Sequence, residues 1–245
     1  MCGRFVVAKT VSQIKEIFEA DDIIGAQPEI SFNIAPTQTI SMIVERPDER
    51  DQSGDPIGDI HREIHAARWG LVPRWSKGPD SGAPLFNARI ETVAEKPSFK
   101  DSFLRRRAAV PASGYFEWQT ASDGTKRPFY INAGDDGLFA FAAVYEWWLD
   151  ETKAKDDPSR WLLSTAILTK DASGSIEHIH DRSPVFLSPE SLDHWLNPAV
   201  IGDAALLSEI STDSVRVAEE IKFHQVGSEV GSVRNNEPNL IRPIS

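Results

Sequence analysis

Cysteine is nearly absent from this chain, which contains one, Cys2, in 245 residues. A single cysteine excludes an intrachain disulfide and any zinc site built from several cysteines. The apolar runs fall short of the ~18 residues that span a membrane, and no basic segment followed by an apolar one marks a signal peptide. We therefore expect a cytoplasmic protein with no membrane partner.

Signatures of nucleotide binding and of serine hydrolases are also missing. The sequence has neither a glycine-rich phosphate-binding motif nor a Gly-x-Ser-x-Gly turn. Its net charge of −11 argues against non-specific binding to nucleic acid. Isolated arginines within aromatic or proline-flanked segments still leave room for a local basic groove. They are Arg4, Arg68, Arg74, Arg89 and Arg182.

The length of the chain fits one large domain with a substantial core, and no internal repeat or low-complexity segment divides it. We expect a single domain over residues 1–245. Two acidic clusters near 46–63 and 150–160 contain glycine or proline. This composition is typical of solvated loops, so we predict polar loop insertions at both places.

Hydrophobic periodicity and turn residues predict many strands and few helices. The expected helices cover 11–20, a short segment from Ser98, 188–196 and 201–210. The expected strands cover 39–45, 64–71, 108–119, 128–132, 138–147, 161–169, 184–187, 214–218 and 221–226, with 235–245 extended. Because most strands follow one another without an alternating helix, we predict an α+β fold whose mainly antiparallel sheets form a barrel-like core with flanking helices.

Cys2 directly follows Met1, and a small second residue permits removal of the initiator methionine. The mature chain is then expected to begin with a cysteine whose free α-amine, with a pKa of about 7.7–8.0, stands beside a thiol. Such a pair captures an aldehyde as an imine that the sulfur closes to a five-membered thiazolidine. On placement alone, a buried cysteine that falls near the start is an equally good interpretation.

Glu117 lies in the segment Gly-Tyr-Phe-Glu-Trp-Gln at 114–119. On a strand, its side chain shares one face with Tyr115 and Gln119, while the rings between them face the core. A carboxyl group among aromatic side chains has a raised pKa and can transfer protons near neutral pH. An exposed glutamate on an edge strand fits the same pattern equally well.

Two further segments carry polar residues in an apolar context. In the first, at 85–92, Asn87 is placed to orient a thiol or a sugar oxygen, and Arg89 to hold a phosphate. Taken alone, this segment fits a turn asparagine and a surface arginine better. In the second, the spacing of His178 and His180 resembles a metal-binding face, but no further ligand cluster accompanies it. We therefore expect no metal and no cofactor, and interpret one histidine as an acid or base or as a structural residue.

Aromatic and guanidinium groups alternate at 67–75, in Ala-Arg-Trp-Gly-Leu-Val-Pro-Arg-Trp. Such a mixture is suited to stacking on unpaired bases and following a phosphate backbone. Arg68 and Trp69 are therefore candidate residues for binding single-stranded nucleic acid. Packing in the core is the simpler explanation for the tryptophans of the later strands, Trp147, Trp148 and Trp161.

In these motifs the sequence resembles the SOS-response-associated peptidase family, also called abasic-site processing proteins. The resemblance runs in order through nearly the whole chain. It rests on Met-Cys-Gly-Arg-Phe at 1–5, Asn-Ile-Ala-Pro-Thr at 33–37, Arg-Trp-Gly-Leu-Val-Pro at 68–73, Asn-Ala-Arg-Ile-Glu-Thr at 87–92, Val-Pro-Ala-Ser-Gly-Tyr-Phe-Glu-Trp at 110–118 and His-Asp-Arg at 180–182.

The resemblance implies a DNA-damage protein that links Cys2 to the aldehyde of an abasic site in single-stranded DNA as a thiazolidine, with autopeptidase and lyase activities. By the same matching, Glu117 exchanges protons with the Cys2 amine, Asn87 orients the reacting groups, and His180 assists sugar-ring opening and reversal. The implied partner is abasic single-stranded DNA, and we expect a monomer that joins the nucleoid when bound. The implied DNA contacts are Arg4, Asn33, Pro36, Arg89, Thr169 and Arg182.

One residue departs from the family pattern His-x-Arg-Met-Pro, because Ser183 stands where the family usually has methionine. The change removes an apolar contact beside His180 but no proton-transfer group. Two other functions stay open. An amidohydrolase with an N-terminal cysteine nucleophile also begins Met-Cys-Gly, but it does not account for Glu117 and His180. A non-covalent reader of single strands needs the arginines but not the thiol.

Overall fold

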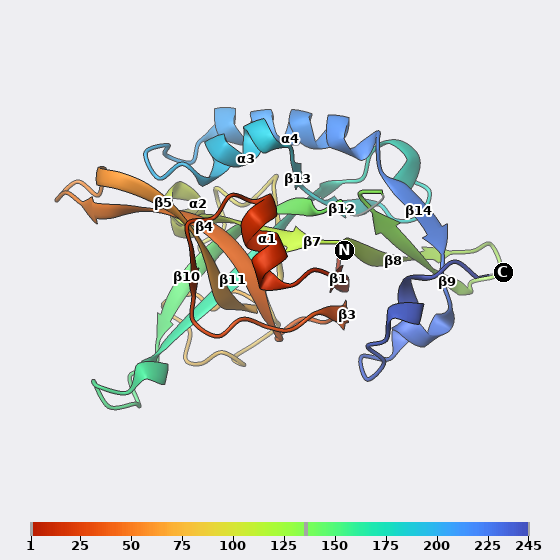
Figure 1. Ribbon diagram of the computed structural model, residues 1–245, viewed down its shortest axis with the longest axis horizontal. Coiled ribbons are helices and arrows are strands. Elements are labelled where there is room, and N and C mark those ends of the chain that lie inside the picture. Colours follow the sequence, from red (N-terminus) through yellow and green to blue (C-terminus); the bar gives the residue numbers. More distant parts are fainter. Residues whose placement is uncertain (1, 135–136, 245) are drawn as a thin grey trace.

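The computed structural model of the protein describes residues 2–134 and 137–244. Within them the chain forms two mostly antiparallel sheets with helices on the outside, which confirms the predicted α+β class. Helices α3 (Pro189–Leu196) and α4 (Ala204–Ala218) lie along one side of the molecule (Figure 1). None of the helices in this part of the chain is long and apolar enough to cross a membrane.

The larger sheet curls into a partial ring rather than a closed barrel. Its strands, in spatial order, are β12 (Arg182–Pro184), β11 (Trp161–Asp171), β10 (Phe139–Leu149), β7 (Arg107–Ala112), β4 (Thr39–Arg50), β5 (Pro56–Trp69) and β2 (Asp22–Ile24). Strand β11 also pairs in parallel with β5, which brings the two sides of the sheet together. Two short strands extend it, since β13 (Phe186–Leu187) pairs with β10 and β6 (Asn87–Arg89) pairs with β11.

The smaller sheet carries the start of the chain. Its strands, in spatial order, are β14 (Lys222–Gln225), β9 (Lys126–Asn132), β8 (Gly114–Thr120), β1 (Phe5–Val7) and β3 (Ser31–Ile34). All of its pairings are antiparallel, and β8 and β9 form a hairpin across residues 121–125. Because β1 lies between β8 and β3, the residues before Phe5 run alongside β8.

The two sheets are joined at Ser113, where the predicted strand 108–119 divides into β7 and β8. Gly114 allows β8 to approach β9 closely at this junction, because a Cβ there would lie 2.5 Å from the carbonyl oxygen of Ile131. Ser113 fixes the bend, since its hydroxyl accepts a hydrogen bond from the backbone of Ala8 and its carbonyl accepts one from Tyr130 Oη. The polar residues of β8 therefore leave the larger sheet just as they approach the start of the chain.

A cluster of aromatic side chains fills the space where the two sheets meet. Most of its ring pairs are edge-on or tilted and one is stacked, geometries that add about 0.5–1.5 kcal/mol per pair beyond burial. The members are Phe5, Trp69, Tyr115, Phe139, Phe141 and Phe186, all of them buried. Because Phe5 belongs to β1, this cluster packs the N-terminal strand against the larger sheet.

The polar loop predicted near 46–63 is wrong, because the segment is the outer half of a long hairpin formed by β4 and β5 (Figure 1). Charged side chains of opposite sign meet across it, with Arg62 Nη2 2.6 Å from Glu45 Oε1 and His61 Nε2 3.0 Å from Asp48 Oδ1. Cross-strand pairs of this kind stabilise a strand in water. The sequence alone did not show these cross-strand pairs, so its density of charged residues favoured a loop.

The strand predicted at 214–218 is also wrong, because α4 continues through it to Ala218. Buried side chains recur at four-residue spacing along this helix, at Leu206, Ile210, Ser214 and Ala218. Asp203 caps its first turn by accepting a hydrogen bond from the backbone of Leu206. The alternating valines of the last turn imitated a strand in the sequence.

The remaining helices are short. They are α1 (Val11–Ile17), α2 (Lys100–Arg105) and the 3-10 turns η1 (Pro158–Arg160), η2 (Gly174–Ile176), η3 (Ser228–Gly231) and η4 (Pro238–Ile241). A capping box starts α1, since Gln13 and Thr10 bond reciprocally. The last segment is not simply extended as predicted, because η4 interrupts it, and Ser245 lies outside the described residues.

Candidate active site

Cys2 lies beside β8 because of the register of β1. Phe5 pairs with Tyr115 and Val6 with Gly114, so the same register carried toward the N-terminus sets Gly3 opposite Glu117. Cys2 is fully buried and packs as part of the main hydrophobic core. The only cysteine of the sequence therefore sits next to the one glutamate that the aromatic motif singled out.

Asn87 reaches Cys2 from the larger sheet. It begins β6, which pairs in parallel with β11 so that Asn87 lies opposite Ile167. Its side-chain Nδ2 donates a hydrogen bond of 2.8 Å to the carbonyl oxygen of Cys2. The other end of this amide, Oδ1, is buried and makes no hydrogen bond to a described residue. A buried acceptor aimed into a site costs stability, and a bound molecule can satisfy it.

Burial controls the protonation of Glu117 and Cys2. Glu117 is 4% exposed, and this burial raises the pKa of its carboxyl group from 4.5 to about 7. Burial raises the pKa of the Cys2 thiol far above its usual range, and the neighbouring charge of Glu117 raises it further. The thiol is therefore neutral in this structure, while the carboxyl group can accept or release a proton near neutral pH.

His180 approaches Glu117 from the turn that follows η2, with 3.8 Å between its Nε2 and Glu117 Oε2. Its Nδ1 accepts a hydrogen bond of 2.9 Å from the backbone N–H of Arg182. That bond keeps the proton of a neutral ring on Nε2, facing Glu117. Asp181 Oδ1 is also 2.8 Å from Nδ1, but burial prevails and lowers the pKa of His180. The neutral imidazole is thus an oriented hydrogen-bond donor.

The four predicted catalytic residues meet at one point although they come from separate parts of the sequence. Cys2 supplies a thiol, Glu117 a carboxyl group that titrates near pH 7, and His180 a neutral imidazole. Asn87 holds the backbone of Cys2. Such a set can move protons to and from a substrate bound at Cys2 without a metal ion.

Comparison with known proteins gives the same relationship as the motifs. The family model described as "SOS response associated peptidase (SRAP)" matches residues 1–233. The chain belongs to this family. The matched region contains Cys2, Asn87, Glu117 and His180.

Several curated relatives match over nearly the full length of the chain. "Abasic site processing protein YoqW" of Bacillus subtilis is 35% identical over 242 residues, covering 98% of this chain and 99% of that protein. "Abasic site processing protein YedK" of Escherichia coli is 31% identical over 248 residues and covers both chains completely. "Abasic site processing protein HMCES" of Gallus gallus is 28% identical, covering all of this chain and 78% of that protein.

Solved structures agree with the fold. A crystal structure of a protein from Bacteroides thetaiotaomicron matches with a TM-score of 0.78 and 22% identity, covering both chains completely. A phage-related protein from Bordetella bronchiseptica matches with a TM-score of 0.60 and 23% identity over 92% of this chain. At this identity the likeness supports the fold of the SRAP chain and nothing about its substrate.

Arg182 and Thr169, two of the predicted phosphate contacts, lie deep beside the site. Both oxygens of Glu91 accept hydrogen bonds from the Arg182 guanidinium, at 2.8 and 2.9 Å, and Asp171 Oδ1 lies 2.5 Å from its Nη1. A further bond from Nη2 holds the carbonyl oxygen of Thr169. Two carboxylates thus already neutralise this arginine, and a phosphate must compete with them.

Arg4 and Asn33 brace the C-terminal segment in this structure. Arg4 Nη1 donates to Asn33 Oδ1 at 2.9 Å and to the carbonyl oxygen of Val230 at 3.0 Å. The amide nitrogen of Asn33 donates to the carbonyl oxygens of Val230, Ser232 and Asn235. Asn33 is 2% exposed, so its contacts within the chain leave little for DNA.

We expect Asn33→Ala to lower the free energy of unfolding by about 1–3 kcal/mol, because buried carbonyl groups lose their donor. Urea unfolding of the variant and the unaltered protein measures this change. Asn236→Ala is the matched control, since Asn236 is exposed and bonds Ser31 and Phe32 instead. An unchanged unfolding free energy together with weaker DNA binding would instead assign Asn33 to the DNA surface.

The predicted stacking residue Trp69 does not face solvent. It is fully buried, and its indole N–H donates a hydrogen bond of 2.9 Å to the carbonyl oxygen of Phe86. No face of this ring is open to a base in this structure, so the interpretation of Trp69 as a stacking platform is wrong here. Arg68 is bound to Asp80 at 2.7 Å, while Trp75 at the end of the same motif is 70% exposed.

Arg89 and Pro36 are the predicted DNA contacts that remain accessible. Arg89 is exposed at the end of β6, two residues beyond Asn87, and makes no side-chain hydrogen bond to the described residues. Pro36 is half-buried in the turn between β3 and β4, beside Thr37, whose φ of 76° is strained for a β-branched residue. Both stay predicted contacts.

Tyr115 and Gln119, which the sequence placed on the same strand face as Glu117 without giving them a role, belong to the site's surroundings. Tyr115 is fully buried, its hydroxyl makes no hydrogen bond to a described residue, and burial followed by the charges of Cys2 and Glu117 raises its pKa. Gln119 donates a hydrogen bond of 2.9 Å to the carbonyl oxygen of His178. It thereby ties the turn that carries His180 to β8. Residues 115, 117 and 119 alternate along the strand, and this spacing could have indicated that all three lie near the site.

His178 and Ser183 both pack against other parts of the fold. The His178 ring packs against Phe223 with centroids 5.3 Å apart, whereas His180 lies beside Glu117. Among residues 2–134 and 137–244, no group of three or more His, Cys, Asp or Glu side chains is arranged for a metal ion. Ser183 is buried at 2% in β12, opposite Lys170, and replaces a larger apolar side chain of the family pattern.

Proposed function

We propose that this protein captures abasic sites in single-stranded DNA by forming a covalent thiazolidine at Cys2. The main support is the convergence of Asn87, Glu117 and His180 on the only cysteine of the chain. Relatives that match along almost the whole chain are named abasic site processing proteins, which supports a role in the response to DNA damage. The SOS-response name of the family points in the same direction.

The first step needs the α-amine of Cys2. While Met1 is attached, this nitrogen is an amide and cannot attack an aldehyde, so Met1 must be removed first. The neutral amine then adds to the ring-opened aldehyde of the abasic sugar, and loss of water gives an imine. Glu117, whose pKa is about 7, accepts the proton that the amine releases.

The second step closes the ring. The Cys2 sulfur adds to the imine carbon, the carbon–nitrogen double bond becomes a single bond, and the thiol proton ends on the nitrogen. Because burial keeps the thiol protonated, this addition also needs a base, and Glu117 is the nearest candidate. The product is a five-membered thiazolidine with no change in oxidation state.

In this proposal His180 acts on the sugar of the substrate, and Asn87 positions the backbone of Cys2. In ring opening, the ring oxygen takes the Nε2 proton of His180 as its bond to the anomeric carbon breaks. The anomeric hydroxyl gives its proton to the Glu117 carboxylate, which returns one to the imidazole, and the same transfers run backwards in reversal. Asn87 fixes Cys2 through its carbonyl group, and its unused Oδ1 is placed to accept a hydrogen bond from the substrate. A positioned group of this kind contributes through orientation.

Two further activities belong to the proposal as expectations. An imine at the abasic carbon makes the neighbouring C–H acidic, so loss of the 3′ phosphate by elimination gives a lyase reaction. Removal of Met1 by the protein itself gives the autopeptidase reaction that the family name implies. Strand cleavage measures the lyase reaction, and loss of Met1 from purified protein that still carries it measures the autopeptidase reaction.

Denaturing electrophoresis tests the proposal against its rivals. Protein without Met1 is mixed with an abasic single-stranded oligonucleotide, heated in denaturant and separated by size. A slower, heat-stable band supports covalent capture, and the same oligonucleotide with an intact base is the control. Loss of the band on heating favours a non-covalent reader, and release of glutamate from glutamine favours an amidohydrolase.

DNA capture is expected to weaken with salt in spite of the net charge of −11. On single strands, log K falls with log salt by roughly 0.7 per phosphate neutralised. Three or four contacting arginines give a slope of about −2 to −3, and Arg89→Ala should make it shallower by about 0.7. Binding of an intact oligonucleotide between low and high salt measures the slope. A flat dependence would remove the argument for a basic groove.

His180→Ala is expected to slow reversal at least as much as formation. The imidazole delivers a proton to the sugar oxygen on the way in and is needed again when the thiazolidine reverts. Crosslinks of the variant should therefore persist longer than those of the unaltered protein when an excess of unlabelled abasic trap is added. His178→Ala, which alters the ring packed on Phe223, is the matched control. Normal reversal in His180→Ala would remove this role.

A further inference from the structure

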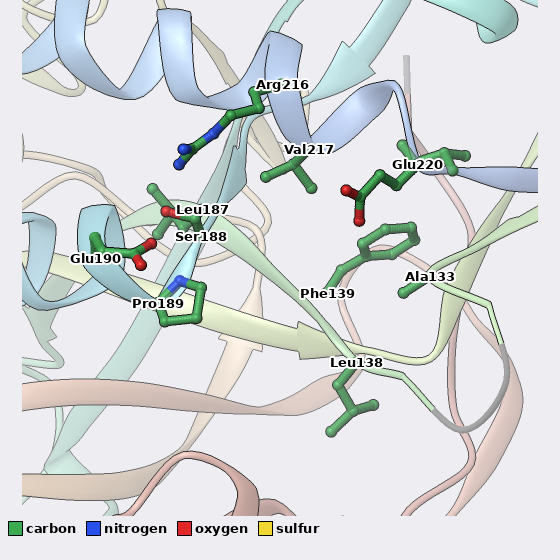
Figure 2. A pocket seen from close by; sticks show the side chains of 11 residues that line it. Ala133, Leu138, Phe139, Leu187, Ser188, Pro189, Glu190, Arg216, Val217 and Glu220 are labelled. Atoms are coloured by element: carbon green, nitrogen blue, oxygen red, sulfur yellow. The ribbon is translucent and has the colours of Figure 1, made fainter.

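Two adjoining hollows form one groove on the side of the molecule that carries α3 and α4. Their volumes are about 420 and 380 Å³, each in the range of ligand pockets. They share four lining residues, Leu138, Leu187, Ser188 and Pro189. Figure 2 shows the first hollow, with side chains of α4 on one side and the start of α3 on the other. We call the two together the α3–α4 groove.

The floor of the α3–α4 groove is apolar. Leu138, Leu187 and Val217 line the first hollow, and the exposed Ile17 extends the apolar surface into the second. Phe139 closes the floor and contacts Tyr115 with ring centroids 6.3 Å apart. Because Tyr115 belongs to the strand that carries Glu117, an aromatic layer separates this groove from Cys2.

The rim of the groove is acidic. The lining contains two guanidinium groups, and carboxylates neutralise both, since Arg62 binds Glu45 and Asp193 at 2.6 Å each and Arg216 binds Asp213 at 2.5 Å. Four carboxylates line the groove, Glu19, Glu190, Asp193 and Glu220. Figure 2 shows Glu190 and Glu220 on opposite sides of the first hollow. Together with Glu45 and Asp213, which bind the arginines from outside the lining, six carboxylates surround two guanidinium groups.

We propose that the α3–α4 groove docks an extended, basic and apolar peptide segment of a partner protein. A lysine or arginine head fits between Glu190 and Glu220, and neighbouring apolar side chains fit against Leu138 and Leu187. The acidic rim repels nucleic acid, and a second copy of this chain carries a net charge of −11 as well. Charge thus excludes the two other obvious occupants and selects a cationic one.

This docking site does not depend on the chemistry proposed for Cys2. The groove shares none of its lining residues with Cys2, Asn87, Glu117 or His180. A bound peptide therefore leaves the abasic-site reaction unchanged unless the partner itself covers the site. Crosslinking rate and peptide affinity can be measured on the same protein, and one can fail without the other.

The test uses an acetylated and amidated peptide of alternating lysine and leucine, five residues long, as a probe. Calorimetry gives its affinity, and amide chemical shifts show where it binds. A peptide in which serine replaces leucine has the same charge and serves as the first control. If leucine side chains enter the groove, the serine peptide binds at least about tenfold more weakly.

Matched variants separate the groove from general attraction to an acidic protein. Glu190→Gln with Glu220→Gln should weaken the lysine–leucine peptide about three- to tenfold, the usual range for two surface ion pairs. Glu49→Gln with Glu151→Gln removes the same charge from exposed residues outside the groove and should change affinity less than twofold. Leu138→Ser should weaken the peptide by removing part of the apolar floor.

Two results would overturn the docking site. One is equal loss of affinity in the groove variant and in the Glu49 and Glu151 variant, which means that only net charge is sensed. The other is a shift map that lacks Leu138, Val217 and Glu220 while the peptide binds. Normal crosslinking by the Glu190 and Glu220 variant shows that either failure concerns the groove alone.

Discussion

Replacing Cys2 with alanine is expected to abolish heat-stable capture of abasic single-stranded DNA. Alanine at position 2 still permits removal of Met1, so the α-amine remains and an imine still forms. Without the sulfur the imine cannot close to a thiazolidine, and water hydrolyses it. A boiled denaturing gel should therefore show no crosslink, whereas treatment with borohydride before heating should trap one.

The matched control for Cys2→Ala keeps the thiol and blocks the amine. An N-terminal tag that leaves Met1 in place does this, because the Cys2 nitrogen is then an amide. This protein should give no crosslink with or without borohydride. A Cys2→Ala crosslink that resists heating without borohydride would contradict the thiazolidine, and another nucleophile would have to be sought.

Replacing Glu117 with glutamine is expected to slow crosslink formation by about 10²–10⁴, the usual contribution of general acid–base catalysis. Glutamine keeps the shape of the side chain and its ability to hydrogen-bond, but it cannot accept the proton of the Cys2 amine. Single-turnover formation on gels measures the rate. Glu151→Gln, a change at an exposed residue of the loop after β10, is the control and should react normally.

The pH dependence gives a second readout for Glu117. Burial raises its pKa to about 7, so the rate of the unaltered protein should rise through pH 7 as the base deprotonates. In Glu117→Gln that step should vanish and leave the titration of the amine at about 7.7–8.0. A normal formation rate, or an unchanged pH profile, would remove Glu117 from the role of base even if Cys2 is right.

The titration of Glu117 should also make the free energy of unfolding depend on pH. Because the folded-state pKa of Glu117 lies above its ordinary value of 4.5, the folded protein binds this proton more tightly than the unfolded chain. The contribution to stability is fully present at low pH and is lost as pH rises from about 4.5 to 7. Glu117→Gln lacks that loss, so its advantage in unfolding free energy over the unaltered protein should grow across this window.

Local patterns predicted the strands of the core because burial and alternation act over a few residues. The segments 138–147 and 161–169 became β10 and β11 for that reason. The outer β4–β5 hairpin was missed, because its stability comes from charges such as Arg62 and Glu45 that meet only across strands. The end of α4 was missed because its buried face is defined by packing against β13 and the sheet rather than by composition.

In the site, too, the sequence indicated the features that depend on neighbouring residues and missed those that depend on distant ones. The motif around Glu117 indicated a carboxyl group among rings, and the structure adds that it is buried beside Cys2. No local pattern could show that Trp69 points inward or that Asn33 holds the C-terminal segment, because both depend on residues far away in the chain. Spacing alone did not predict that the four proposed catalytic residues lie together. That prediction came from the resemblance to the family.

The most direct test of the account is the intact mass of the protein after reaction with an abasic single-stranded oligonucleotide. Covalent capture at Cys2 predicts one species whose mass equals the chain without Met1 plus the oligonucleotide, less one water, with the linked peptide mapping to Cys2. A protein mass that never changes, or a link that maps to a lysine instead, would contradict capture by the N-terminal cysteine.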